Sequence, residues 1–351
     1  MTTPDEQGAT TPLVPLPTQP DGVPWPTNEW PVGSPVVGEP TALQAEIDRL
    51  MTAQDPMLGR TDALVVVQGG RIVAERYGAE VDAASTLISW SMAKSMTAMW
   101  FGMSGLDVSA PAAIAEWDGD DRTAITNEDL LRMRSGLRWT EEYTDEVPSD
   151  VVEMLFGEPK GDMAAFAASA PLAHEPGSVY LYSSGTSNIV AHLAARAIGT
   201  DGDAAATEAS LRERLFAPIG MSSATPKFDD AGTFIGSSFV YATARDFARF
   251  GLLCLRGGHW DGEQLTPQGW VDWCRTPTEV SRGVDDFVHG AHFWCHEDGR
   301  GTFGCHGYLG QYIWMVPALD LIVVRLGERP EEDTEPVKAA LRSIIAAFDP
   351  S

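Results

Sequence analysis

A serine and a lysine three positions apart are the residues of this sequence best suited to chemistry. Ser91 and Lys94 fit the pattern Ser-x-x-Lys, and on a helix two side chains at i and i+3 lie on one face. A serine hydroxyl is a weak nucleophile until a neighbouring group accepts its proton, and a lysine can accept a proton only while its amine is neutral. The spacing therefore predicts Ser91 as a nucleophile and Lys94 as its base.

The sequence around Lys94 favours a neutral amine. The chain has only four lysines, and the neighbours of this one are apolar: Trp90, Met92, Ala93, Met96 and Met99. Burial among apolar side chains lowers the pKa of a lysine. The alternative is that Ser-x-x-Lys occurs by chance and Lys94 is an ordinary surface lysine, which the tetrapeptide alone would favour.

A tyrosine at the predicted start of a helix is the second candidate. Tyr182 lies within Tyr180-Leu-Tyr-Ser-Ser-Gly185, just before the apolar run that begins at Ile189. A tyrosine there can relay a proton between the serine and a leaving group. Standing alone, the motif would more often indicate a tyrosine packed at a helix entrance.

A glycine-containing strand near the end of the chain is the third candidate. Cys305-His-Gly-Tyr308 is followed by Gly310-Gln311, and a glycine inside a strand often marks close approach by a ligand or another backbone segment. The backbone N–H groups of Ser91 and Tyr308 would together form an oxyanion hole.

These residues must be positioned by elements that the hydrophobic pattern predicts. The first hundred residues indicate a helix over 42–53, a β-hairpin of 63–68 and 71–77 joined by Gly69-Gly70, and a helix from Trp90 to Trp100 capped by Ser89. The middle of the chain is mostly helical, with caps at Thr126 and Thr243, a stop at Gly136 and a start at Thr266-Pro267. Strands over 292–296, 304–308, 312–316 and 321–325 and a helix over 334–347 complete the chain.

Strands at both ends with helices between them predict a mixed α/β (α+β) fold, in which an antiparallel sheet from both chain ends is flanked by helices and carries an inserted, mainly helical lobe. We expect a Pro-rich extended arm over 1–40, which holds ten of the 24 prolines. The sheet lobe comprises 41–105 and 236–351, and the helical lobe 106–235. The active site should lie in the cleft between the lobes.

Composition limits the partners of the chain. With 44% hydrophobic and 21% charged residues among 351, it is typical of a globular protein. The 50 acidic against 24 basic residues give a net charge of −26, which opposes binding to nucleic acid or anionic lipid. No signal peptide or membrane span is evident, and four cysteines are too few for a disulfide scaffold. We expect a cytoplasmic protein acting on a small molecule, with a homodimer left open.

The order and spacing of the three motifs resemble the serine β-lactamase and penicillin-binding-protein family, whose motifs are Ser-x-x-Lys, Tyr-x-Asn or Ser-x-Asn, and Lys-Thr-Gly. Within it the chain is most similar to 6-aminohexanoate-dimer (nylon-oligomer) hydrolases and esterases of the class C-like branch. The resemblance runs from about residue 58 to 330 and also rests on these segments: 130–143, 243–251, Phe293-Trp-Cys295 and Gly307-x-x-Gly-Gln311.

The resemblance implies roles for individual residues. Ser91 would be acylated, Lys94 would accept its proton, and Tyr182 would carry protons to the leaving group and water. The N–H groups of Ser91 and Tyr308 would bind the oxyanion. The residues implied in substrate binding are Tyr143, Trp139, Ser184, His306 and Gly307, with Tyr143 matching a tyrosine that contacts the scissile amide. The resemblance implies neither a cofactor nor a metal.

Two departures from the family pattern affect the expected substrate. Ser184 replaces the asparagine of Tyr-x-Asn, and Cys305-His306-Gly307 replaces Lys-Thr-Gly. The cation that usually holds a β-lactam or peptide carboxylate is therefore missing from the strand, although His306 could supply a charge at low pH or a hydrogen bond. Small esters or amides fit better than β-lactams.

Other functions remain as alternatives. A β-lactamase, a D-amino-acid peptidase and a non-catalytic penicillin-binding-type sensor would share the same fold. An α/β-hydrolase is disfavoured because no Gly-x-Ser-x-Gly is found. Zinc at Cys295-His296 and Cys305-His306 is disfavoured because adjacent strand residues face opposite sides. A cross-strand pair of Cys295 and Cys305 is the simpler reading of these cysteines.

Overall fold

The computed structural model describes residues 12–52, 55–143, 148–157, 161–330 and 333–350. Its α-helices are α1 Pro40–Thr52, α2 Met92–Gly102, α3 Asn127–Leu131, α4 Asp150–Phe156, α5 Met163–Ala168, α6 Ser184–Ile198, α7 Ala204–Leu211, α8 Ala244–Leu255, α9 Trp270–Cys274 and α10 Glu335–Ala346. Its strands are β1 Arg60–Gln68, β2 Arg71–Tyr77, β3 Leu87–Ile88, β4 Thr225–Pro226, β5 Val240–Ala242, β6 His259–Trp260, β7 Glu263–Gln264, β8 Val288–His289, β9 Trp294–Cys295, β10 Phe303–Gly307, β11 Gln311–Val316 and β12 Leu321–Glu328.

An antiparallel sheet of seven strands, in the order β2-β1-β12-β11-β10-β9-β8, joins the two ends of the chain. Strand β1 pairs with β12 so that Val65 lies opposite Val324. The predicted hairpin is confirmed: β1 and β2 meet at Gly69 and Gly70, which both adopt the positive φ that such tight turns favour. Two smaller sheets have the orders β3-β5-β4 and β6-β7.

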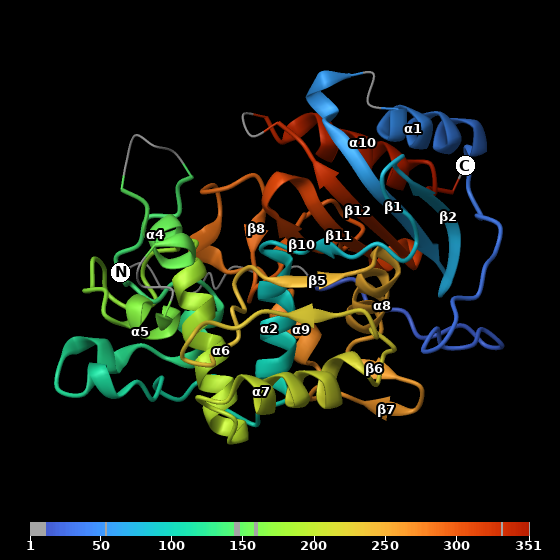
Figure 1. The fold of residues 1–351 in the computed structure, drawn as a ribbon. Helices are drawn as coiled ribbons and strands as arrows, with labels where there is room; N and C mark the ends of the chain where they lie inside the picture. Colours follow the sequence, from blue (N-terminus) through green and yellow to red (C-terminus); the bar gives the residue numbers. More distant parts are fainter. Residues whose placement is uncertain (1–11, 53–54, 144–147, 158–160, 331–332, 351) are drawn as a thin grey trace, which may run out of the picture.

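Helices cover both faces of the main sheet (Figure 1). Leu64 and Val66 pack with α1 and α10 on one face, and Val65 and Val67 pack with α2 and α8 on the other. Strand β1 is buried on both faces, which explains why its sequence is continuously apolar instead of alternating. Helices α4 to α7 lie on the other side of α2 from α1 and α10 (Figure 1). The predicted fold class is confirmed.

The start of α2 differs from the prediction. Ser89 does not cap the helix, because its hydroxyl donates to the carbonyls of Trp90 and Ser238 instead. Ser91 occupies the N-cap position without a capping side-chain bond, and Trp90 has a φ of 44°. Every residue of α2 itself is buried. The nucleophile candidate therefore lies at the very end of a helix that runs through the core.

Several boundaries also differ from the prediction. The caps at Thr126 and Thr243 are confirmed, since each hydroxyl accepts an N–H from the first turn of α3 or α8. The stop at Gly136 is wrong, because α3 already ends at Leu131. The helix predicted to start at Thr266-Pro267 begins only at Trp270, and of the strand predicted over 292–296 only Trp294–Cys295 is extended and paired.

Residues 12–39, from the Pro-rich segment, lie along the sheet and α8. The N–H of Ile72 donates to the carbonyl of Pro31 at 2.9 Å, the guanidinium of Arg249 donates to the carbonyl of Pro26 at 2.7 Å, and the ring of Trp25 packs against Trp260. A regular element is not needed here, since side chains and single backbone bonds hold the segment in place.

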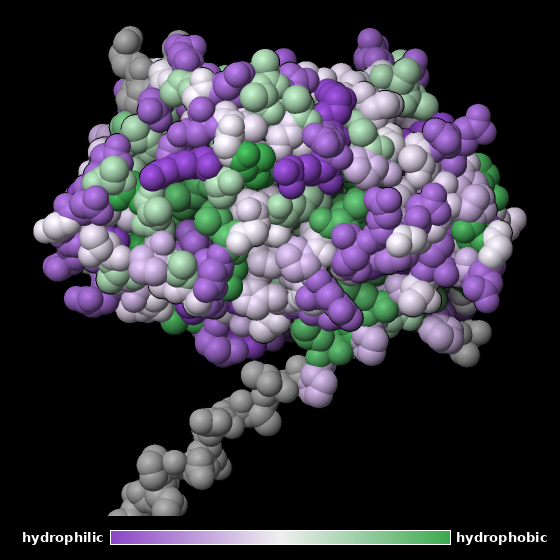
Figure 2. Space-filling view, turned by 90° about the horizontal axis from the view of Figure 1, so that it is seen from below, coloured by the Kyte–Doolittle hydropathy of each residue, from purple (hydrophilic) through white to green (hydrophobic). Residues whose placement is uncertain are grey.

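One face of the molecule is shown in Figure 2. Hydrophilic and hydrophobic residues alternate over it, and the hydrophobic ones form small separate areas. Among the described residues, none of the helices combines the length and the apolar character needed to cross a bilayer.

Candidate active site

Ser91 and Lys94 lie in contact at the start of α2. The Nζ of Lys94 is 2.9 Å from the Oγ of Ser91, at the i, i+3 spacing that the sequence predicted. Ser91 is partly exposed, whereas Lys94 is only 2% exposed. The hydroxyl of Ser91 is thus partly accessible to solvent, whereas the amine of Lys94 that contacts it is buried.

The environment of Lys94 lowers its pKa. Burial is the main cause and brings the pKa down to about 8, while the charge of Glu141 acts in the opposite direction. The other contacts of Nζ are uncharged oxygens, the Oγ of Ser184 at 2.9 Å and the carbonyl of Ser237 at 3.0 Å. With a pKa of about 8, about a tenth of Lys94 is neutral at pH 7 and able to accept a proton, and this fraction rises with pH.

Tyr182 lies beside this pair, in the turn that leads into α6. The Nζ of Lys94 is 4.8 Å from the centre of its ring, and a hydrogen bond links Tyr182 to Ser91. Burial and, to a lesser extent, the nearby charge of Glu141 raise the pKa of Tyr182, while the bond to Ser91 lowers it. On its other side the ring stacks on Trp294 at a centroid distance of 5.6 Å. The structure thus brings all three predicted catalytic residues together.

Glu141 belongs to the same cluster and was missed by the sequence analysis. Its carboxylate accepts the N–H of Ser184 at 2.8 Å and the hydroxyl of Ser184 at 2.5 Å. It also accepts the indole N–H of Trp139 at 2.5 Å. Because Ser184 is the first residue of α6, the carboxylate lies at a helix N-terminus, where unpaired N–H groups and the helix dipole favour an anion.

The predicted oxyanion hole depends on a close approach between β10 and α2. Tyr308 directly follows the last residue of β10, Gly307. A Cβ added to Gly307 would lie 2.4 Å from the carbonyl oxygen of Ser89, so no larger residue fits there without moving the backbone. The glycine thus allows the segment that carries the N–H of Tyr308 to lie against the segment that carries the N–H of Ser91.

A row of partly exposed aromatic rings borders Ser91, and we call it the aromatic row. The ring of Trp90 packs against Phe239 at 5.7 Å and edge-on against Tyr308 at 5.6 Å. Tyr143 stacks on Tyr308 at 4.7 Å, and Phe156, which is 56% exposed, lies 6.4 Å from Phe239. Tyr143 is therefore close to the reacting serine, where the sequence predicted a substrate contact.

Trp139 and Ser184, also predicted to bind substrate, are placed differently. Trp139 is 7% exposed and packs against the first turn of α6, where a Cβ on Gly185 would lie 2.5 Å from its ring. Ser184 is fully buried, and its hydroxyl is hydrogen-bonded to Lys94, Glu141 and Tyr143. Trp139 and Ser184 are therefore buried residues that contact Glu141 and Lys94, and neither is exposed to a substrate.

His306 is separated from Tyr182 by the ring of Trp294, which stacks on both. Trp314 donates its indole N–H to Nε2 of His306 at 3.0 Å. Burial holds the pKa of His306 well below its usual range. A buried imidazole that accepts this bond favours the neutral form, so of the two expected roles, a charge at low pH or a hydrogen bond, the surroundings of His306 disfavour the charge.

A cavity of about 370 Å³ opens beside His306 and Gly307. Two cations from outside the strand line it, Lys338 of α10 and Arg329. The Nζ of Lys338 is bound by Asp286 at 2.6 Å. Strand β10 therefore lacks the cation of the family's Lys-Thr-Gly motif, as the sequence indicated, but the neighbouring cavity contains cations from other parts of the chain.

The cysteines do not form the arrangements considered from the sequence. All four are buried free thiols, and Cys295 lies opposite Phe303 instead of Cys305. Among the described residues, no group of three or more His, Cys, Asp or Glu side chains is placed to hold a metal ion.

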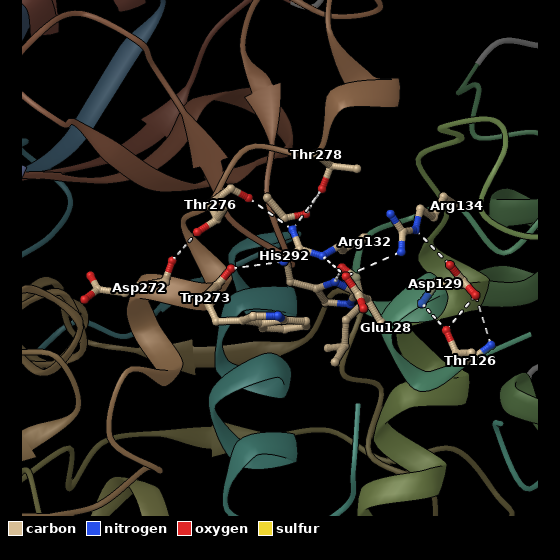
Figure 3. A network of polar contacts seen from close by, with 12 residues as sticks. Thr126, Glu128, Asp129, Arg132, Arg134, Asp272, Trp273, Thr276, Thr278 and His292 are labelled. Carbon is tan, nitrogen blue, oxygen red and sulfur yellow. Dashed lines mark hydrogen bonds and ion pairs between the residues drawn. The ribbon is translucent and has the colours of Figure 1, made fainter. Parts of the chain in front are cut away.

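A second polar cluster, around Arg132 and His292, links the segment after α3 to the end of α9 and the residues that follow it (Figure 3). Arg132, only 6% exposed, donates to Glu128 at 2.7 Å and to Thr278 and the carbonyl of Thr276 at 3.1 Å. Its guanidinium also lies 4.4 Å from the ring centre of Trp273. The segment after α3 is thereby fixed to the irregular segment that follows α9.

His292 is the other centre of this cluster (Figure 3). Its Nδ1 is 2.7 Å from the carbonyl of Leu131, and its Nε2 is 3.0 Å from the hydroxyl of Ser187. Because a carbonyl only accepts, Nδ1 carries the hydrogen and Nε2 accepts from Ser187. The carbonyl of His292 accepts from Ser95 of α2, and burial lowers the pKa of its ring to about 3. His292 is therefore neutral, and its hydrogen bonds connect α2, α3 and α6.

The chain is similar to known proteins in sequence and in fold. The family model described as Beta-lactamase matches residues 52–347. A 6-aminohexanoate-dimer hydrolase from Paenarthrobacter ureafaciens is 26% identical over 300 residues, which cover 78% of this chain and 74% of that protein.

Solved structures show the same fold. A Bacillus anthracis protein assigned as a 6-aminohexanoate-dimer hydrolase superposes with a TM-score of 0.75 at 20% identity, over 96% of this chain and 91% of that one. A penicillin-binding protein from Bacillus halodurans gives a TM-score of 0.64 at 17% identity, over 86% and 99%. With the family model spanning most of the chain, this protein belongs to the beta-lactamase family and is a serine hydrolase.

Proposed function

We propose that the protein hydrolyses small esters or amides through an acyl-enzyme formed on Ser91. The observation that carries the proposal is the 2.9 Å contact between Nζ of Lys94 and Oγ of Ser91. Lys94 is buried, and its pKa is lowered to about 8. A neutral amine at this distance can take the hydroxyl proton as Oγ attacks a carbonyl carbon.

The remaining groups supply the other needs of acyl transfer. The N–H groups of Ser91 and Tyr308 would stabilise the oxyanion of the tetrahedral intermediate. Tyr182, hydrogen-bonded to Ser91, would pass a proton to the leaving group, so that the bond from the carbonyl carbon to the leaving oxygen or nitrogen breaks. Water would then attack the acyl-enzyme by the reverse relay and release the acid.

The aromatic row favours substrates with an apolar part next to the scissile bond. Its exposed rings extend from Tyr143 to Phe156 and flank the nucleophile. Apolar groups of a substrate bind such rings by losing contact with water. The activity named for the Paenarthrobacter relative, hydrolysis of a 6-aminohexanoate dimer, supports an amide as one substrate class.

A carboxylate-bearing substrate, such as a β-lactam or a D-amino-acid peptide, is the second candidate. The observation in its favour is that Lys338 and Arg329 line the cavity next to Gly307. Asp286 already binds Lys338, which weakens the attraction for a further carboxylate. A cytoplasmic location and a homodimer stay predictions from the sequence.

The test compares turnover of p-nitrophenyl butyrate, a linear 6-aminohexanoate dimer and nitrocefin by the wild-type protein and by Ser91→Ala. We expect the ester to be cleaved fastest and nitrocefin slowest. Ser91→Ala should lose more than about 10³-fold in kcat while it stays folded. Ser95→Ala is the matched control, because Ser95 is a buried serine one turn further along α2 whose hydroxyl is bonded to a carbonyl. Retained turnover by Ser91→Ala would disprove the proposal.

A further inference from the structure

The amine of Lys94 has three oxygen neighbours that differ in what they can do with a hydrogen. They are the Oγ of Ser91 at 2.9 Å, the Oγ of Ser184 at 2.9 Å and the carbonyl of Ser237 at 3.0 Å. The carbonyl can only accept a hydrogen bond, whereas each hydroxyl can donate or accept. The protonation chemistry of Lys94 therefore depends on where the hydrogen of Ser184 points.

Glu141 determines the direction of that hydrogen. Three donors meet at its carboxylate: the indole N–H of Trp139, the backbone N–H of Ser184 and the hydroxyl of Ser184. An ionised carboxylate is an acceptor only. The single hydrogen of the Ser184 hydroxyl is therefore used in the 2.5 Å bond to Oε1 of Glu141, and toward Lys94 the same oxygen can only accept.

A neutral amine has two hydrogens and one lone pair. Two of the neighbours of Nζ, the carbonyl of Ser237 and the oxygen of Ser184, require hydrogens from it. The lone pair is left for the third neighbour, the hydroxyl of Ser91, which is the group that must lose its proton. We infer that Glu141 is a positioning residue which, through Ser184, turns the lone pair of neutral Lys94 toward Ser91. This inference rests on the proposed function.

The arrangement gives a reason for the serine at position 184. The family motif has an asparagine there, and an asparagine carbonyl presents an acceptor whose character does not depend on a rotating hydrogen. A serine hydroxyl can rotate and present either a hydrogen or a lone pair. Glu141 removes that freedom, and its own place is fixed by Trp139 and by the N-terminus of α6.

The separation of Glu141 from Lys94 by one hydroxyl is equally important. Among the described residues, the other titratable groups near Lys94 are Tyr182, His289 and His292, and Tyr143 is hydrogen-bonded to Ser184. Burial lowers the pKa of both histidines and keeps them neutral, well below the usual range for His289 and to about 3 for His292. Glu141 is the group that raises the pKa of Lys94. A carboxylate in direct contact would hold the amine protonated, whereas one placed behind Ser184 orients it at a smaller electrostatic cost.

The test is the pH dependence of kcat/KM for p-nitrophenyl butyrate in Glu141→Gln. In the wild type the rate should rise with pH around the pKa of Lys94, about 8. Glu141→Gln should lower kcat by about 100-fold, because the amide can donate to Ser184 and free its hydrogen to point at Lys94. Its rise should also begin at lower pH, since the anion that raises the pKa of Lys94 is gone. A purely structural role would lower kcat without this shift.

Three further variants make the result decisive. Glu142→Gln removes the same charge from the exposed neighbouring residue and should change neither quantity. Glu141→Asp keeps the charge but shortens the reach to Ser184, so kcat should fall while the pH midpoint stays at its wild-type value. Glu141→Gln should add little in a Ser184→Ala background, because the two residues act as one unit.

Each contrary result has a distinct meaning. Wild-type kcat in Glu141→Gln, an unshifted pH midpoint, or additive losses in the double variant would overturn the role of Glu141. If Glu141→Gln does not fold, unchanged kcat in both Glu141→Asp and Ser184→Ala would do the same. A wild-type protein that neither hydrolyses the ester nor reacts with a fluorophosphonate probe would overturn the proposed function itself.

Discussion

Lys94 and Arg132 are two buried cations in different surroundings. Arg132 is paired directly with the carboxylate of Glu128 at 2.7 Å and stacks on Trp273. Among the described residues, the hydrogen-bond partners of Lys94 are uncharged oxygens, and the carboxylate of Glu141 is reached through a hydroxyl. A buried cation with a carboxylate in contact is a stable link between elements, whereas one without it is poised to lose its proton. Burial alone therefore does not distinguish a catalytic site from a structural one.

The largest effect should come from replacing Lys94. Lys94→Met removes the base and should lower kcat for p-nitrophenyl butyrate by more than about 10³-fold, comparable to the loss in Ser91→Ala. The melting temperature should stay the same or rise, because an apolar side chain replaces an amine whose charged form is disfavoured by burial. Thermal unfolding and ester turnover on one sample measure both. A large loss of stability would mean that Lys94 is a structural cation like Arg132.

Replacing Arg132 should lower stability strongly and change kcat little, which is the opposite of the effect expected at Lys94. Arg132→Met leaves the acceptors of Thr276 and Thr278 without this donor and leaves Glu128 with only the longer contact to Arg134 at 3.4 Å, so it should lower the free energy of unfolding by about 3 kcal/mol. Well below the melting temperature, kcat should stay within a few-fold of the wild type. Urea unfolding curves and turnover at low temperature provide the measurement. If kcat fell with stability intact, the separation between the two clusters would be wrong.

The smallest effect should come from removing a single acceptor of Arg132. Thr278→Val deletes one hydroxyl partner at 3.1 Å and should cost about 1 kcal/mol of unfolding free energy without changing kcat. Ser184→Ala deletes one acceptor of Lys94 at 2.9 Å and should change kcat far more than stability. Measured side by side, these two hydroxyl deletions test whether the same loss has different consequences in the two clusters.

The sequence was informative where chemistry depends on local spacing. Ser91 and Lys94 are three residues apart on one helix, so their contact followed from the spacing. The meeting of this pair with Tyr182, which precedes α6, followed from the resemblance to a family with the same order of three motifs. The hairpin of β1 and β2 and the pairing of strands from both chain ends followed from apolar runs and a Gly-Gly turn in the same way.

Glu141 could not be predicted because nothing local marks it. It lies outside any helix or strand, 43 residues before Ser184, and an acidic residue in an irregular segment is usually solvated. The only signal was its place between Trp139 and Tyr143, in a segment already associated with the site. The carbonyl of Ser237 is invisible in principle, since every residue has one.

The contact between Gly307 and the carbonyl of Ser89 has a consequence for how substrate preference can change. With only 2.4 Å available to a Cβ, position 307 tolerates glycine alone without moving β10, and the spacing of the two proposed oxyanion donors is fixed by that steric limit. Positions 305 and 306 are limited by packing instead: Cys305 is buried in the core, and His306 packs against Trp294, Tyr312 and Trp314. A change of substrate preference is therefore expected from the partly exposed residues around Ser91 and not from this strand.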